Sequence, residues 1–134
     1  HTLEEKINSY TTCPSGGPLV QHAVVAMFEA HHQGKISVEK IVEKMCHNPA
    51  KIFKIEKRGF IKEGYFADIA IVNAYLPWNV KKENILYKCG WSPFEGYNFK
   101  SRVTHTFVNG KLVYANGKVK ETKAGQRLLF DRTL

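Results

Sequence analysis

The sequence contains 134 residues, 43% of them hydrophobic and 24% charged, so it can form one globular domain with a core and is neither disordered nor fibrous in composition. Its net charge is +8, but the lysines are scattered without an arginine-rich run or a base-stacking motif, so a solvated surface is predicted and a nucleic-acid partner is not. Three widely separated cysteines argue against a disulfide framework and favour the cytoplasm. The lack of a long apolar run argues against a membrane span.

The first eighteen residues are polar, rich in turn formers and begin on His1 instead of a methionine. Because the sequence opens on His1, we expect a chain that has been cut, processed or truncated, and the start does not have the basic-then-apolar layout of a signal peptide that would explain a secretory cleavage. Residues 14–18 read Pro-Ser-Gly-Gly-Pro, and two glycines allow the backbone to approach a ligand or another strand closely. A long loop is therefore predicted at the amino-terminal end.

The first predicted helix covers residues 19–33. Apolar side chains recur there at helical spacing, between Pro18, which suits a first helical turn, and Gly34, which suits a left-handed cap. The apolar face is so wide that the helix requires burial on more than one side.

A second helix is predicted over residues 38–47, because Ser37 is a favourable N-cap. Asn48 and Pro49 then resemble a new cap and a first-turn proline, so the chain is expected to restart there as a short helix over residues 50–53.

Strands are predicted in the second half of the chain. Residues 67–72 form a short apolar run, and residues 103–115 alternate as strands do. Asn109 and Gly110 in the middle of this stretch are a strong signal for a tight hairpin turn, and residues 116–117 repeat it. The expected architecture is helices first and a small antiparallel sheet second.

Residues 73–102 form a long segment without a clear period, and loops of that length pack on something or carry function. Its aromatic residues are expected to form a core or an interface rather than a stacking platform for bases. They are Trp78, Trp91, Phe94, Tyr97 and Phe99.

The residues do not predict a complete catalytic site within the chain. The six histidines stand alone or as the adjacent pair His31 and His32, whose side chains point about 100° apart on a helix and make a poor chelate. No phosphate-binding loop, nucleophile elbow or zinc-protease motif is present. Neither catalytic residues nor metal ligands are therefore predicted in this chain.

Several segments, in order along nearly the whole chain, resemble the carboxy-terminal end of dihydroorotases in the amidohydrolase superfamily. The run His-Thr-Leu-Glu-Glu-Lys resembles the sequence that follows the Asp-His-Ala-Pro of that family, of which only His1 is present here. The other matching segments are Pro-Ser-Gly-Gly-Pro (residues 14–18), Asn-Pro-Ala-Lys-Ile-Phe (48–53), the Gly-x-x-Ala-Asp strand (64–72), Ser-Pro-Phe-Glu-Gly (92–96) and Val-Asn-Gly-Lys (108–111).

This resemblance implies an α/β plus β fold built from parts of two domains. Residues 1–58 would be the last active-site loop and the terminal helices of an incomplete (β/α)8 barrel, and residues 59–134 the carboxy-terminal part of a small β-sandwich. The parent enzyme would use two zinc ions to interconvert dihydroorotate and N-carbamoyl-L-aspartate in pyrimidine biosynthesis. The metal ligands would precede His1, so this chain alone is expected to be inactive and to bind no metal.

By the same resemblance, three substrate-binding residues fall within the chain. His1 matches the histidine that contacts the substrate carboxylate, and Ser15 and Gly16 match a loop that offers backbone hydrogen bonds to the pyrimidine ring. The family more commonly has Phe-Gly at that loop, which makes its assignment less secure than that of His1.

Three alternatives stay open from the sequence: an allantoinase-like or dihydropyrimidinase-like cyclic amidohydrolase, a non-catalytic interaction module derived from this fold, and a basic anion-binding domain. The resemblance also implies a homo-oligomeric parent that includes the missing amino-terminal part. We further expect the apolar face of residues 19–30 and the hairpin edge of residues 103–114 to be left open, so that the isolated chain self-associates or pairs with that missing part.

Overall fold

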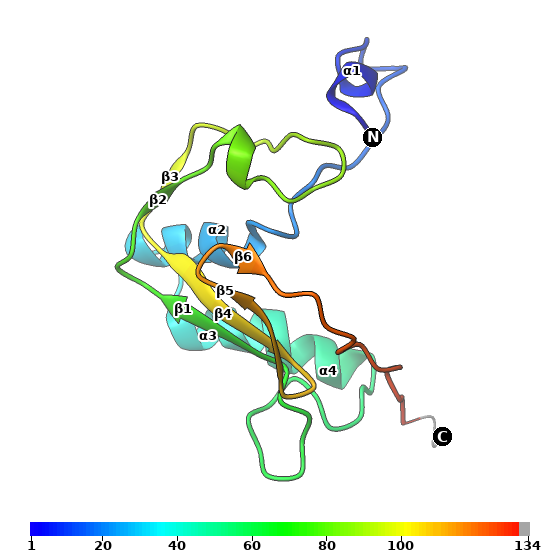
Figure 1. Cartoon of the computed structure of the whole chain (residues 1–134), viewed down its shortest axis with the longest axis vertical. Coiled ribbons are helices and arrows are strands. Elements are labelled where there is room, and N and C mark those ends of the chain that lie inside the picture. Colours follow the sequence, from blue (N-terminus) through cyan, green and yellow to red (C-terminus); the bar gives the residue numbers. More distant parts are fainter. Residues whose placement is uncertain (132–134) are drawn as a thin grey trace.

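The computed structural model describes residues 1–131 and opens with a short helix, α1 (Leu3–Lys6), where only a loop was predicted. The helix forms because Thr2 and Glu5 make a capping box, in which the Glu5 amide donates to Thr2 Oγ1 at 3.3 Å and the Thr2 amide donates to Glu5 Oε2 at 3.0 Å. Figure 1 shows α1 at one end of the molecule, away from the main sheet.

Helix α2 spans Ala23–His32 and is followed by Gly34 in the predicted left-handed conformation (φ +71°), but it begins after the predicted start at residue 19. Residues 20–22 form a turn instead, with the His22 amide donating to Leu19 O at 3.0 Å. The amide of Gln21 donates to the hydroxyl oxygen of Tyr87 at 2.7 Å, so a tertiary contact holds the segment where a first helical turn was expected.

One continuous helical run follows, made of α3 (Val38–Val42), the π-helix η1 (Glu43–His47) and α4 (Asn48–Ile52). Ser37 caps it as predicted, accepting a hydrogen bond from the Lys40 amide at 3.2 Å. The predicted restart at Asn48 is wrong, because Asn48 has helical dihedral angles (φ −66°, ψ −43°). The wider π turn ends at His47, two residues before Pro49, which has no amide hydrogen and whose ring would clash with a carbonyl of the preceding α-turn.

The main sheet is antiparallel, with strand order β1-β4-β5-β6. Its strands are β1 (Ile69–Asn73), β4 (Arg102–Val108), β5 (Lys111–Ala115) and β6 (Lys118–Val119). The predicted hairpin is confirmed, because Asn109 (φ +49°) and Gly110 (φ +78°) form a tight turn between β4 and β5. The expectation of an open hairpin edge is wrong over most of its length, since β4 lies between β1 and β5, and Tyr114 in β5 pairs with Val119.

The long segment of residues 73–102 contains structure that the sequence did not indicate. It includes strand β2 (Trp78–Asn79), the 3-10 helix η2 (Lys82–Asn84) and strand β3 (Asn98–Phe99), and β2 and β3 pair as a small separate ribbon. This ribbon lies between the main sheet and α1 (Figure 1). Two-residue strands are too short to produce a detectable alternation, which explains why pattern analysis missed them.

The core forms where α2 meets the β2–β3 ribbon. Val25, Val80 and Phe99 are at most 2% exposed and pack together. The partly buried side chains around them are Ala26, Trp78, Ile85, Phe94 and Val103. In α2, Val25 and Phe28 are buried, whereas Leu19 and Val20, which precede the helix, are exposed. The prediction that the apolar face of residues 19–30 is open is therefore wrong for the helix itself and correct for the two residues before it.

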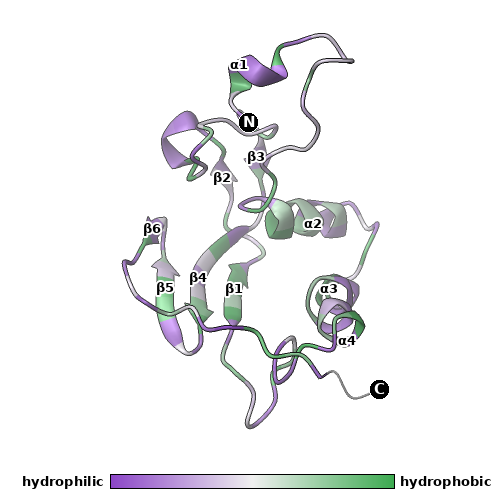
Figure 2. Ribbon diagram, turned by 90° about the vertical axis from the view of Figure 1, so that its right-hand side faces the viewer, coloured by the Kyte–Doolittle hydropathy of each residue, from purple (hydrophilic) through white to green (hydrophobic). Residues whose placement is uncertain are grey.

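Helices α2, α3 and α4 lie on the β1 side of the main sheet, and β6 lies farthest from them (Figure 2). Near α4, the chain end returns to the helical half: the Glu56 amide donates to Leu129 O at 3.0 Å, and Ile55 forms an isolated antiparallel bridge with Phe130. Within the described residues, no helix combines the length and apolar character that a bilayer crossing requires.

Candidate functional site

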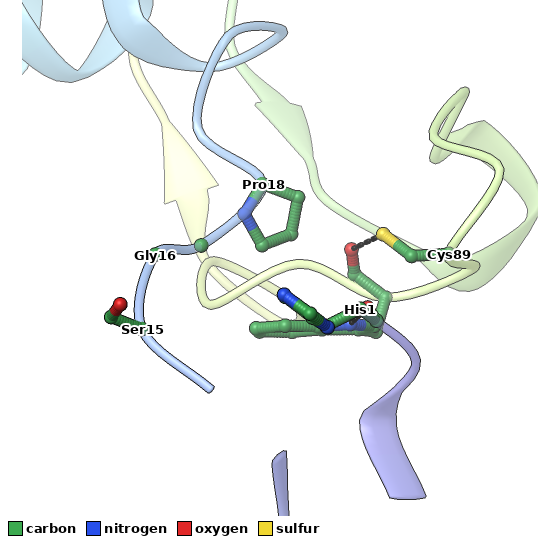
Figure 3. Close-up of a pocket in the computed structure, with 7 residues that line it drawn as sticks. His1, Ser15, Gly16, Pro18 and Cys89 are labelled. Atoms are coloured by element: carbon green, nitrogen blue, oxygen red, sulfur yellow. Dashed lines mark hydrogen bonds between the residues drawn. The ribbon is translucent and has the colours of Figure 1, made fainter. Parts of the chain in front are cut away.

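A pocket of about 260 Å³ lies where three sequence-distant segments meet (Figure 3). Its lining residues are His1, Ser15, Gly16, Gly17, Pro18, Cys89 and Trp91. All three residues predicted to bind substrate are therefore brought to one cavity, although fifteen positions separate His1 from Gly16. The third wall, from residues 89–91, was not predicted as part of a site.

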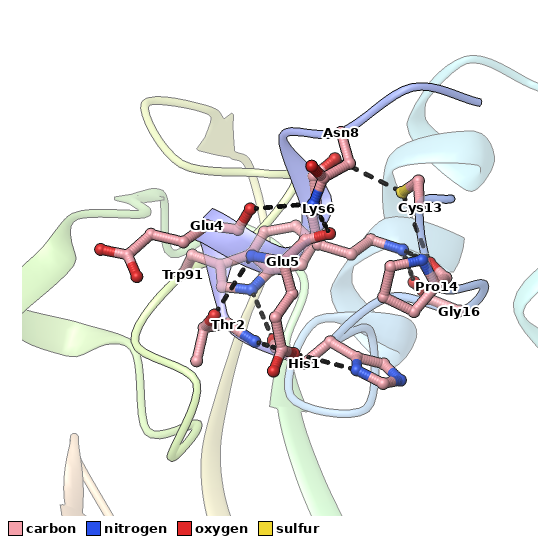
Figure 4. A network of polar contacts seen from close by, with 10 residues as sticks. All are labelled: His1, Thr2, Glu4, Glu5, Lys6, Asn8, Cys13, Pro14, Gly16 and Trp91. Atoms are coloured by element: carbon pink, nitrogen blue, oxygen red, sulfur yellow. Dashed lines mark hydrogen bonds and ion pairs between the residues drawn. The ribbon is translucent and has the colours of Figure 1, made fainter. Parts of the chain in front are cut away.

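His1 is fixed by contacts from two sides (Figure 4). Its Nδ1 lies 3.0 Å from Glu5 Oε2, and its carbonyl oxygen accepts a hydrogen bond from the Trp91 indole nitrogen at 3.1 Å. Glu5 is the same residue that caps α1, so the short helix that the sequence did not predict also holds the imidazole. The backbone and ring of His1 are thus tied to α1 and to the far wall of the pocket.

Lys6 holds the loop that carries Ser15 and Gly16. Its ammonium group donates hydrogen bonds to the carbonyl oxygens of Pro14 and Gly16, the latter at 2.8 Å. Gly16 has φ +83°, a left-handed conformation that disfavours any other residue. With two of its carbonyls bound to Lys6, this polar loop has a defined path along the pocket and is less free than its composition suggested.

Cys89 and Trp91 are the pocket residues that sequence reasoning missed. Trp91 was noted only as one of several aromatic residues expected in a core or interface, and no pattern marked Cys89. Phe94 and Phe99 pack in the core cluster as expected, with ring centroids 5.3 Å apart. Trp91 is not part of that cluster and lines the pocket instead. The clue in the sequence was that Trp91 lies in a Gly-Trp-Ser-Pro run, in a loop able to reach another segment.

The other histidines lie outside this pocket. His22 is fully buried, and burial lowers its pKa, so its imidazole is neutral near neutral pH. His47 stacks on Phe60 with centroids 4.4 Å apart, and His32 hydrogen bonds to Ser101 Oγ at 2.9 Å. Each of these rings packs against a neighbour or makes a hydrogen bond, but among the described residues His22 Nε2 is buried without a hydrogen-bond partner.

Within residues 1–131, no three or more histidine, cysteine or acidic side chains come together in a way that could hold a metal ion. The residues present therefore do not form a metal centre, and no metal-dependent step is assigned to them. What the pocket offers is binding: an imidazole, a hydroxyl, backbone polar groups of a glycine loop and an indole face. This set suits a small, planar, polar molecule.

Comparison with known proteins adds the decisive observation. The model of the Amidohydrolase family matches residues 7–113, most of the chain. The chain belongs to the amidohydrolase family. The match includes Ser15 and Gly16, whereas His1 lies before its first residue.

Among characterised amidohydrolase relatives, the dihydroorotase of Pyrococcus furiosus is 36% identical over 129 residues, which is 96% of this chain and 30% of that protein. The dihydroorotase of Endomicrobium trichonymphae is 38% identical, covering 85% of this chain and 27% of that protein. The chain thus spans about 30% of the length of the curated relatives that it matches.

Solved structures place the amidohydrolase chain in the same fold. L-hydantoinase (dihydropyrimidinase) from Arthrobacter aurescens superposes with a TM-score of 0.74 at 27% identity, over 83% of this chain and 25% of that one. D-hydantoinase from a Thermus species gives a TM-score of 0.80 at 20% identity, over 92% and 28% respectively, which supports the fold alone. The arrangement of helices followed by an antiparallel sheet is therefore shared with these enzymes.

Proposed function

We propose that this chain is the carboxy-terminal part of a dihydroorotase-like zinc hydrolase, which interconverts dihydroorotate and N-carbamoyl-L-aspartate in the cytoplasm. In this proposal, residues 1–58 provide the last active-site loop and terminal helices of a barrel, and residues 59–134 part of a β-sandwich. The observation that carries it is the gathering of His1, Ser15 and Gly16 around one pocket, supported by dihydroorotase relatives along 96% of the chain.

The chain's own task in this proposal is to bind and orient the ring. Because Nδ1 of His1 is engaged by Glu5, Nε2 is the ring nitrogen that meets the substrate carboxylate. Ser15 and Gly16 contribute polar groups to the ring amide. The zinc centre would be held by the amino-terminal part of the protein and would supply the activated water.

The test is hydrolysis of dihydroorotate by this chain assembled with its amino-terminal part. Replacing His1→Ala removes a hydrogen bond to a charged group, so KM for dihydroorotate should rise at least about tenfold while kcat changes little. His105→Ala serves as the matched control, since His105 lies in β4 and does not line the pocket. An unchanged KM in His1→Ala, or a folded assembly without activity, would contradict the proposal.

A second candidate is a hydantoinase or dihydropyrimidinase activity, which the 27% identical hydantoinase structure favours. The two candidates differ in the ring that they accept, because dihydroorotate carries a carboxylate and dihydrouracil does not. Comparing kcat/KM for these two rings decides between them. Faster turnover of dihydrouracil, with no effect of His1→Ala, would favour the second candidate.

A further inference from the structure

Two of the three segments that line the pocket lie more than seventy residues apart, residues 15–18 and residues 89–91. Their relative position is held just beyond Pro18, where Gln21 bridges to the loop that leads into the second wall. Three hydrogen bonds make this bridge. Gln21 Nε2 donates to Asn84 O at 2.8 Å, the Leu86 amide donates to Gln21 Oε1 at 2.9 Å, and the Gln21 amide donates to Tyr87 Oη at 2.7 Å.

The side-chain amide of Gln21 has the chemistry that this bridge requires. It donates to one backbone carbonyl and accepts from the backbone amide two residues later, as a neighbouring strand would. Glutamate would keep the acceptor but lose the donor, and methionine would keep the length but lose both. The partly buried amide is therefore matched to the polar backbone of residues 84–86, which has no strand neighbour at this point.

His22, the residue after Gln21, makes a second contact with the same loop. Ser92 Oγ accepts a hydrogen bond from the Phe94 amide at 3.2 Å, so its hydroxyl hydrogen is available to His22 Nδ1, which lies 3.0 Å away. Both residues are buried, and Ser92 directly follows Trp91 of the pocket wall. Residues 21–22 thus fasten the far wall on both sides, through Tyr87 before it and Ser92 after it.

We propose that Gln21 is a positioning residue, which sets the distance between the glycine loop and the Cys89–Trp91 wall and thereby the fit of the ring substrate. The substrate class rests on the proposed function, but the positioning itself does not. Gln21 touches neither the pocket nor a reacting group, and it acts through Pro18 on one side and Tyr87 on the other.

The positioning is tested without any activity assay. The chain has two tryptophans, so 5-fluorotryptophan incorporated into this chain and assembled with the unlabelled amino-terminal part gives one ¹⁹F resonance for Trp91 and one for Trp78. Trp78 serves as the internal reference, because its indole donates to Ser101 O within the core. Gln21→Met should shift or broaden the Trp91 resonance and leave that of Trp78 in place.

Gln21→Glu is the milder variant, which decides the question if Gln21→Met does not fold. Asn98→Ala is the matched control, because it removes a side-chain amide bonded to Asn79 at 2.8 Å outside the pocket. An unmoved Trp91 resonance in a folded Gln21 variant would overturn the proposal. Loss of both resonances in both Gln21 variants would also overturn it, since Gln21 would then support the whole fold.

Activity supplies the second readout. Loss of two hydrogen bonds should raise KM for the ring substrate on the order of tenfold, with kcat changed less than about twofold, because binding groups move while the chemistry lies elsewhere. A fall in kcat with an unchanged KM would overturn the positioning role. If the unmodified assembly hydrolyses no cyclic amide, the proposed function fails, and the ¹⁹F result still decides whether Gln21 positions the wall.

Discussion

Replacing Gly59 with alanine should be among the most destabilising single-methyl changes in this protein. Gly59 follows the helical run and has φ +78°, in the left-handed region. A Cβ atom there would lie 2.5 Å from the Cβ of Ala50 and 2.7 Å from the carbonyl oxygen of Cys46. Ala50 is buried, and neither contacting atom can rotate away, because one is a methyl on helix α4 and the other belongs to the backbone of η1.

Gly64 provides a matched reference for the size of the effect. Its φ is +77°, nearly the same as that of Gly59, but a Cβ atom there would meet nothing within 4 Å. Gly64→Ala should therefore lower the free energy of unfolding by the left-handed penalty alone, about 1–2 kcal/mol. Gly59→Ala adds overpacking of about 1–3 kcal/mol, for a total of roughly 2–5 kcal/mol.

The two variants are compared by urea unfolding, followed by tryptophan fluorescence at one protein concentration. With a urea dependence of about 2 kcal/mol per molar, the midpoint of Gly59→Ala should lie on the order of 1 M below that of Gly64→Ala. Equal midpoints would refute the reasoning, because they would show that the close approach of Gly59 to Ala50 and Cys46 does not exist or relaxes freely.

Two further predictions concern buried polar groups. Arg58→Met should lower the free energy of unfolding by about 2–3 kcal/mol in urea titrations, because the buried guanidinium donates to Asp68 Oδ2 and to Asn109 Oδ1 at 2.8 Å, and both oxygen atoms would lose this donor. A loss smaller than about 0.5 kcal/mol would contradict the role of this network. Burial lowers the pKa of His22 below its ordinary value of 6.5, so the unfolded chain binds a proton more readily, and stability should fall as pH decreases below about 6.5. Urea unfolding at about pH 7.5 and 5.5 should show this loss of stability, at most about 1.4 kcal/mol per pH unit. The pH dependence of stability should be weaker in His22→Gln. An equal pH dependence in that variant would refute the assignment of the effect to His22.

The candidate site was only half predictable. The resemblance to dihydroorotases selected His1, Ser15 and Gly16 from linear motifs, and these residues lie around one pocket. Trp91 and Cys89 complete the lining but escaped notice, because their place depends on a loop that returns across more than seventy residues. The substrate-binding roles of His1, Ser15 and Gly16 stay predictions.

Local chemistry explains which parts of the fold were predicted correctly. Ser37, Gly34 and the Asn109-Gly110 turn were all identified from the sequence, because a cap or a tight turn depends on residues within a few positions of one another. Some errors arose where distant segments determine the outcome, and others where a local feature was missed, as with the capping box of Thr2 and Glu5 that starts α1. The contact between Gln21 and Tyr87 displaces the start of α2, and the π turn before Pro49 keeps the helix continuous.

By itself, then, the sequence determined the order of the longer helices and strands, the tight turn at Asn109-Gly110 and the resemblance to the amidohydrolase family. Only the tertiary structure decided which surfaces are covered and which residues line the pocket. The reason is physical: caps and turns are satisfied by neighbouring backbone groups, whereas burial and a shared cavity require partners that the linear order does not reveal. The bridge from Gln21 to residues 84–87 is such a partnership, and it connects two of the three segments that line the candidate site.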